Sequence, residues 1–186
     1  MPRKPRFYLP GIPAHIVQRA NSRQAVFFSE DDYAVYLDWL RLGAGKHGCK
    51  IHAYVLMTNH VHLLATPDSR ESISKTIQYV GRNYVSYVIR TYGKSGTLWE
   101  GRHKGCLVSS SDYLLTCMRY IEMNPVRAGM VETPAEYRWS IYRANGLGEA
   151  SDLVEPHSDY LSLGSARDER RSPTVSCFAL HWSRRR

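Results

Sequence analysis

The pattern of apolar and polar residues predicts four β-strands in the first 108 residues of the chain. These strands cover residues 15–21, 51–57, 60–66 and a stretch within 98–108. Only Thr58 and Asn59 separate the second strand from the third, so we expect the two to form a hairpin. We expect a bulge in the last strand at Gly101 or at Gly105.

Apolar residues at helical spacing predict three helices between and after these strands. The helices lie at about 30–43, 71–92 and 111–124. Ser29 and the acidic residues that follow it start the first helix, because negative charge stabilises the N-terminal turn. Three glycines are expected to end this helix, namely Gly43, Gly45 and Gly48. Pro125 marks the end of the third helix, since the residue before a proline disfavours helical geometry.

The order of these elements predicts an α+β fold. Strand, helix, strand, strand, helix, strand is the split β-α-β pattern of a ferredoxin-like sandwich, with an antiparallel sheet and helices on one face. After residue 145 the periodic pattern gives way to Gly, Ser, Asp and Arg. We therefore expect one domain over residues 1–145 and a basic, mobile C-terminal extension over residues 146–186.

The charge of the chain indicates a polyanionic partner. Its formal net charge is +8 and its pI is about 9.4, and a surface rich in Lys and Arg attracts phosphate backbones. A merely basic protein without a nucleic-acid partner is the alternative. The four cysteines form no Cys-x-x-Cys pair, which argues against a structural zinc site and favours reduced thiols. Neither a signal peptide nor an apolar run of about 20 residues is visible, so we expect a cytoplasmic protein without membrane contact.

The tripeptide His60-Val61-His62 is the first candidate for chemistry. Side chains along a strand alternate between its two faces, so both imidazoles point the same way and Val61 points to the opposite face. Two neighbouring imidazoles with a third ligand from elsewhere can bind a divalent metal ion. Considered alone, the tripeptide is more typical of two structural histidines than of a metal site.

The second candidate is one of the 13 tyrosines, Tyr120. Asn124 follows it at i+4, so a phenol and a metal-binding amide share one helix face. A phenol with a pKa near 10 is a poor nucleophile unless a cation or metal ion assists it. A packed core aromatic is the alternative for Tyr120. Tyr113 lies seven residues earlier on a similar face and is the alternative nucleophile.

Four motifs in a fixed order closely resemble the single-tyrosine HUH transposases. They occupy residues 60–64 (HVHLL), 96–102 (GTLWEGR), 119–129 (RYIEMNPVRAG) and 137–140 (YRWS). The branch that the chain resembles most is the REP-associated tyrosine transposases, and the resemblance covers about residues 7–143. The combination is highly specific, although no single motif would be.

The resemblance implies cleavage and rejoining of single-stranded DNA with Mg²⁺ or Mn²⁺. It implies that His60, His62 and Asn124 bind the metal ion and that Tyr120 attacks the DNA, leaving a 5′-phosphotyrosine and a free 3′-OH. The implied partner is single-stranded DNA that folds into hairpins of palindromic repeats. The protein is expected to be a monomer or a homodimer.

Basic residues near these motifs and in the N-terminal arm are expected to bind the DNA backbone. They are Arg3, Lys4, Arg6, Arg82, Arg102, Lys104, Arg119 and Arg127. Two other functions remain open from the sequence. One is a non-catalytic regulator that binds DNA hairpins on the same fold, and the other is a metal-dependent phosphodiesterase that uses water as the nucleophile.

Overall fold

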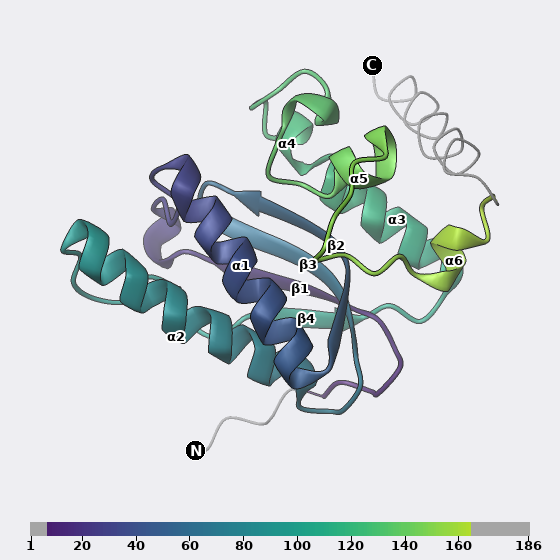
Figure 1. Ribbon diagram of the computed structural model, residues 1–186, viewed down its shortest axis with the longest axis horizontal. Coiled ribbons are helices and arrows are strands. Elements are labelled where there is room, and N and C mark those ends of the chain that lie inside the picture. Colours follow the sequence, from purple (N-terminus) through teal and green to yellow (C-terminus); the bar gives the residue numbers. More distant parts are fainter. Residues whose placement is uncertain (1–6, 165–186) are drawn as a thin grey trace.

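A four-stranded antiparallel sheet forms the centre of the computed structural model, which describes residues 7–164 (Figure 1). Its strands are β1 (Ala14–Arg19), β2 (Cys49–Met57), β3 (His60–Pro67) and β4 (Lys104–Leu107). They lie in the order β2-β3-β1-β4, and every neighbouring pair is antiparallel. The predicted α+β fold with a split β-α-β order is therefore confirmed.

Two long helices cover one face of the sheet. Helix α1 (Glu30–His47) and helix α2 (Ser72–Tyr92) lie side by side and pack on the strands, as the sequence pattern predicted. The third long helix, α3 (Ser111–Glu122), packs against β2 and β3. Its residue Tyr120 contacts the rings of His15 and His62, so α3 lies on the opposite face of the sheet.

The alternation of side chains explains why this second face carries the polar residues. In β1 the residues at 14, 16 and 18 are buried under α1 and α2, whereas those at 15, 17 and 19 face the other way. Val17 pairs with His62 and Arg19 pairs with His60 across the β1–β3 ladder. Paired residues share a face, so the histidine pair and the polar side chains of β1 point toward α3.

Shorter elements complete the described chain. They are the 3₁₀ turns Asn21–Arg23 and Pro134–Glu136 and the helices α4 (Asn124–Arg127), α5 (Tyr142–Leu147) and α6 (Ser158–Leu161). Glu155 donates its backbone N–H to the carbonyl of Ile51 in β2, at 2.8 Å, and so ties this late segment to the sheet edge. Residues 165–186, the greater part of the predicted basic extension, lie outside the described residues. Within residues 7–164, none of the helices has the length and apolar character needed to cross a membrane.

Helix α1 passes through two of the three glycines that were expected to end it. Gly43 and Gly45 lie inside the helix, and only Gly48 ends it, with a left-handed φ of 63°. A Cβ atom at Gly43 would lie 2.9 Å from Cδ1 of Tyr79 in α2. The prediction was wrong here because Gly43 allows two helices to approach closely, which local sequence does not reveal.

We expect opposite effects from alanine at these two helical glycines. Gly43→Ala should lower the free energy of unfolding by roughly 1–2 kcal/mol, since the new methyl group overpacks the contact with Tyr79. Gly45→Ala should raise it by about 0.5–1 kcal/mol, because this position has open space around it and alanine favours the helix. Urea unfolding of both variants measures the difference, and equal effects would contradict the close approach of α1 and α2.

Candidate active site

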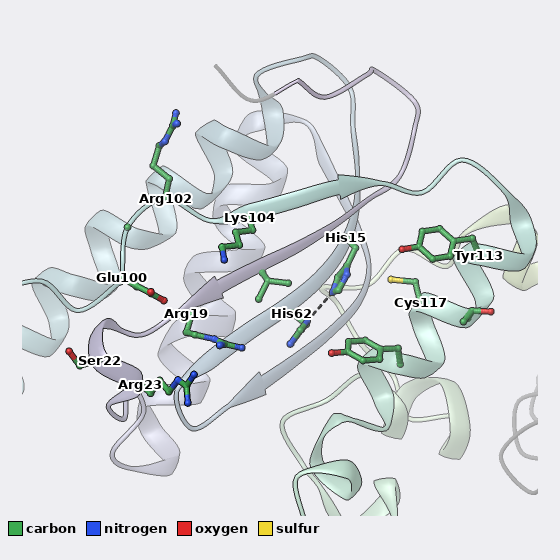
Figure 2. Close-up of a pocket in the computed structure, with 14 residues that line it drawn as sticks. His15, Arg19, Ser22, Arg23, His62, Glu100, Arg102, Lys104, Tyr113 and Cys117 are labelled. Carbon is green, nitrogen blue, oxygen red and sulfur yellow. Dashed lines mark hydrogen bonds between the residues drawn. The ribbon is translucent and has the colours of Figure 1, made fainter. Parts of the chain in front are cut away.

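A cavity of about 1100 Å³ lies between the polar face of the sheet and helix α3 (Figure 2). Strands β1 and β3 form its floor, α3 forms one wall and the segment leading into β4 forms another. Figure 2 shows His15 and His62 pointing into this space toward α3 and the cationic side chains of Arg19, Arg23, Arg102 and Lys104 around it.

Three imidazoles lie next to one another on this face of the sheet, and two of them, His15 and His62, line the cavity. Nε2 of His15 and Nδ1 of His62 are hydrogen-bonded at 2.9 Å, and the two rings are nearly parallel with centroids 5.1 Å apart. The ring of His60 lies 5.0 Å from that of His62, and its Nδ1 is bonded to Oδ1 of Asn59 at 2.7 Å. His60 and His62 therefore share a face, as strand alternation requires. His15 was not among the predicted site residues.

Burial keeps these imidazoles uncharged. It lowers the pKa of His15 and His60, and it lowers the pKa of His62 to about 3, where the positive charge of Arg19 acts in the same direction. At neutral pH each ring is therefore neutral and retains a nitrogen lone pair. Neutral imidazoles are good ligands for divalent metals, so His60 and His62 fit a metal ion by the chemistry of their donor atoms.

Tyr120 lies directly beside the histidines, in the last turn of α3. Its ring centroid is 5.6 Å from that of His62 and 5.9 Å from that of His15, with both pairs in edge-on geometry. The guanidinium carbon of Arg127 in α4 lies 5.0 Å from the centre of the same ring. The side chain is 37% exposed and lines the cavity, so its hydroxyl belongs to an accessible site and not to the core.

The second candidate tyrosine, Tyr113, also lines the cavity but lies in a different environment. It is two turns earlier on α3 and is 48% exposed. Interaction with Cys106, together with partial burial, raises the pKa of the Tyr113 phenol. A raised pKa makes the phenolate nucleophile harder to form. The contacts with the histidine rings therefore favour Tyr120 over Tyr113.

Comparison with known families now identifies the class of protein. Residues 9–124, more than half of the chain, match the family described as "Transposase IS200 like". The chain belongs to the IS200-like transposase family. The resemblance seen in its motifs is confirmed at this level, and the activity of the family is DNA cleavage and transfer. No curated protein matches the chain.

Two solved structures are similar to this IS200-like transposase. A REP-associated tyrosine transposase bound to a REP hairpin has a TM-score of 0.66 and 16% sequence identity. That similarity covers 84% of this chain and 93% of the other. A candidate transposase from Deinococcus radiodurans has a TM-score of 0.44 and 24% identity over 64% of this chain and 95% of its own. The first of these similarities shows that the two proteins have the same fold.

Asn124 of this IS200-like transposase lies one turn beyond Tyr120 but not at the cavity wall. Its amide Nδ2 donates to the backbone carbonyl of Tyr120 at 2.9 Å, across the junction between α3 and α4. The helix ends at Glu122 and α4 begins at Asn124, so the amide caps the backbone there. The spacing from Tyr120 is as predicted, while a role of Asn124 as metal ligand stays a prediction.

The predicted DNA-binding residues divide into three groups. Arg102 and Lys104 line the cavity and Arg127 covers Tyr120, so these three surround the candidate site. Arg82 lines a separate cavity of about 630 Å³ on the α2 side of the sheet, and Arg119 lies near Glu122. Arg3, Lys4 and Arg6 lie outside the described residues.

Two further cations, Arg19 and Arg23, line the cavity but were not predicted from the sequence. Their position at the cavity depends on the pairing of β1 with β3 and on the turn after β1, which the sequence pattern does not reveal.

A buried carboxyl group lies on the side of α3 that faces the protein interior. Glu122 is 1% exposed, its Oε1 accepts a hydrogen bond from Nδ2 of Asn145 at 2.8 Å, and its Oε2 has no partner among the described residues. Burial raises the pKa of Glu122 to about 7, although Asn145 and Arg119 oppose the shift. The folded chain therefore holds a proton on Glu122 that the unfolded chain releases near its ordinary pKa of 4.5.

Because of this shift, the free energy of unfolding should fall as pH rises from about 4.5 to about 7, since the folded state binds more protons over that interval. Glu122→Gln mimics the protonated carboxyl group and should remove this pH dependence. We expect the free energy of unfolding of the variant to exceed that of the parent by on the order of 1–3 kcal/mol at pH 8 and to equal it at pH 4. Urea unfolding at both pH values measures this, and a pH-independent difference would exclude titration of Glu122 as the cause.

Proposed function

We propose that this transposase cleaves and rejoins single-stranded DNA at hairpin-forming repeats, with Tyr120 as the nucleophile and a divalent metal ion as cofactor. The observation that carries the proposal is the edge-on contact of Tyr120 with His62 inside an open cavity. A nucleophile, two uncharged imidazoles and several cations then surround a single space large enough for a phosphodiester and its neighbouring nucleotides.

The groups in the cavity support the following reaction. Oη of Tyr120 attacks the phosphorus, so a tyrosine–phosphate bond forms while the bond from phosphorus to the 3′ oxygen breaks. The phenol loses its proton and the departing 3′ oxygen gains one, which leaves a free 3′-OH. The 5′-phosphotyrosine keeps the energy of the broken bond, so a 3′-OH can reverse the step and rejoin DNA.

His60 and His62 would hold the metal ion, with Asn124 as the proposed third ligand. When bound, Mg²⁺ or Mn²⁺ neutralises negative charge on the scissile phosphate as the transition state forms. Arg102 and Lys104 line the cavity and Arg127 lies over the ring of Tyr120, which supports a role for these three cations in binding the DNA backbone.

Hairpins of palindromic repeats are the substrate that we propose. The REP-associated tyrosine transposase with this fold was solved bound to a REP hairpin, which supports a hairpin partner for this chain. The cations that line the cavity, Arg19, Arg23, Arg102 and Lys104, support a DNA partner without reference to that structure. We further propose that residues 1–145 act as the catalytic domain, with residues 146–186 as a basic extension, in a monomer or homodimer that works in the cytoplasm.

End-labelled oligonucleotides test the proposal and its two alternatives together. A hairpin oligonucleotide with single-stranded flanks is labelled at its 5′ end in one sample and at its 3′ end in another, then incubated with protein and Mn²⁺. Only the 3′ label should migrate with the protein on a denaturing gel, because the tyrosine retains the 5′ phosphate. Cleavage without any adduct would indicate attack by water, and binding without cleavage would indicate a regulator.

A further inference from the structure

We propose that His15 and Asn59 are positioning residues that hold His62 and His60 in a single tautomer, with Nδ1 protonated and Nε2 free for the metal ion. The inference rests on the proposed function, because it assigns the partners of the two proposed imidazole ligands. Neither His15 nor Asn59 belongs to the motif of two histidines itself. His15 contacts Nδ1 of His62, and Asn59 contacts Nδ1 of His60.

The tautomer of His60 follows from the orientation of the Asn59 amide. Nδ2 of Asn59 donates to the backbone carbonyl of Arg23 at 3.0 Å, which fixes the two ends of the amide. Oδ1 of Asn59 therefore faces Nδ1 of His60 at 2.7 Å. A carbonyl oxygen only accepts hydrogen bonds, so Nδ1 of His60 must carry the proton. The lone pair of the neutral ring is then on Nε2.

His15 provides the same kind of contact to His62. Its Nε2 lies 2.9 Å from Nδ1 of His62, so one of the two nitrogens must donate and the other must accept. When Nδ1 of His62 donates, the lone pair of His62 is on Nε2, as in His60. The two histidines then present equivalent donor atoms, and in each of them a partner holds the other ring nitrogen, as is usual for metal-bound histidines.

The surroundings of His15 restrict it to this position. It lies on β1, which is hydrogen-bonded to β3 on one side and to β4 on the other, so its backbone is held by two ladders. Its ring stacks on His62 and meets Tyr120 edge-on, with centroids 5.1 and 5.9 Å away. One side chain thus touches both a proposed metal ligand and the proposed nucleophile.

Binding of Mn²⁺, followed by the electron paramagnetic resonance of the free ion, gives the first test. His15→Ala should weaken binding by roughly 10- to 100-fold, the usual cost of losing a partner of a metal-bound histidine. His15→Gln, which keeps an acceptor oxygen, should restore most of the affinity. His47→Ala at the end of α1 is the matched histidine control and should bind as the parent does.

The tautomers themselves give a second test that needs no metal. Long-range ¹H–¹⁵N spectra of histidine-labelled protein should show Nδ1–H for both His60 and His62. His15→Ala should change His62 to a mixture of tautomers and leave His60 unchanged, while Asn59→Ala should do the reverse.

The results separate this inference from the proposed function. If the parent protein binds no Mn²⁺, the metal part of the proposed function fails, together with the role of His15 in it. If the parent binds Mn²⁺ and His15→Ala binds equally well with unchanged tautomers, the inference alone is overturned. A loss of one coordinated imidazole on His15→Ala, seen in pulsed spectra of bound Cu²⁺, would make His15 a ligand and would also overturn it.

Discussion

Tyr120→Phe is expected to abolish the covalent protein–DNA adduct and to lower strand cleavage by roughly 10³-fold or more. Phenylalanine keeps the ring contacts with His15 and His62 but removes the hydroxyl that is proposed to attack phosphorus. Because the side chain is partly exposed, the melting temperature should change little. A denaturing gel with a labelled hairpin oligonucleotide measures both the adduct and the cleaved strand.

Tyr113→Phe is the matched control for this substitution. Tyr113 lies on the same helix and in the same cavity, so its variant should form the adduct at nearly the parental rate. An adduct with Tyr120→Phe, or loss of the adduct in Tyr113→Phe alone, would reassign the nucleophile. Full activity of Tyr120→Phe without an adduct would favour a water-using phosphodiesterase.

His62→Ala should have the second largest effect, a fall in cleavage of roughly 10²- to 10³-fold even with excess Mn²⁺. Removing the imidazole of His62 leaves one imidazole where two are proposed to hold the metal ion. A bound metal ion lowers the free energy of such a transition state by several kcal/mol. His62 is buried, so its loss also opens a small void beside His15. Single-turnover cleavage rates across a Mn²⁺ series separate weak metal binding from a lower maximal rate.

Two other histidines serve as controls for His62→Ala. His47 lies at the end of α1, where its ring contacts Tyr79 of α2 on the face of the sheet opposite the site, and its alanine variant should cleave normally. His52 is buried and bonded through Nε2 to Oγ1 of Thr66 at 2.7 Å, so its loss should lower the melting temperature but spare the metal dependence. Cleavage by His62→Ala at the parental rate would contradict the proposed metal site.

Sequence patterns predicted the fold well where an element has one clear buried face. The alternation in β1 and the apolar stripe of α2 reflect burial directly, and both elements lie close to their predicted bounds. The end of α1 was missed because the close contact between Gly43 and Tyr79 joins residues far apart in the chain. The last strand is shorter than the predicted stretch, since Trp99 packs beside Tyr36 and Tyr84 and only 104–107 form the strand.

The candidate site was predictable only where local geometry determines it. Strand alternation placed His60 and His62 on one face because the side-chain period is two. His15 could not be found in this way, because its contact with His62 depends on the register between β1 and β3. The one-turn spacing placed Asn124 near Tyr120, but it did not predict that the amide would bond to the Tyr120 carbonyl.

Mass spectrometry of the trapped adduct is the most direct test of a tyrosine nucleophile at position 120. Trypsin cleaves after Lys104, Arg119 and Arg127, so the two candidate tyrosines fall on separate peptides, residues 105–119 and residues 120–127. After nuclease trimming of the DNA, we predict the mass of the residual nucleotide on the peptide 120–127, which contains Tyr120 alone. Nucleotide mass on the peptide 105–119, or on neither peptide despite cleavage, would contradict this account.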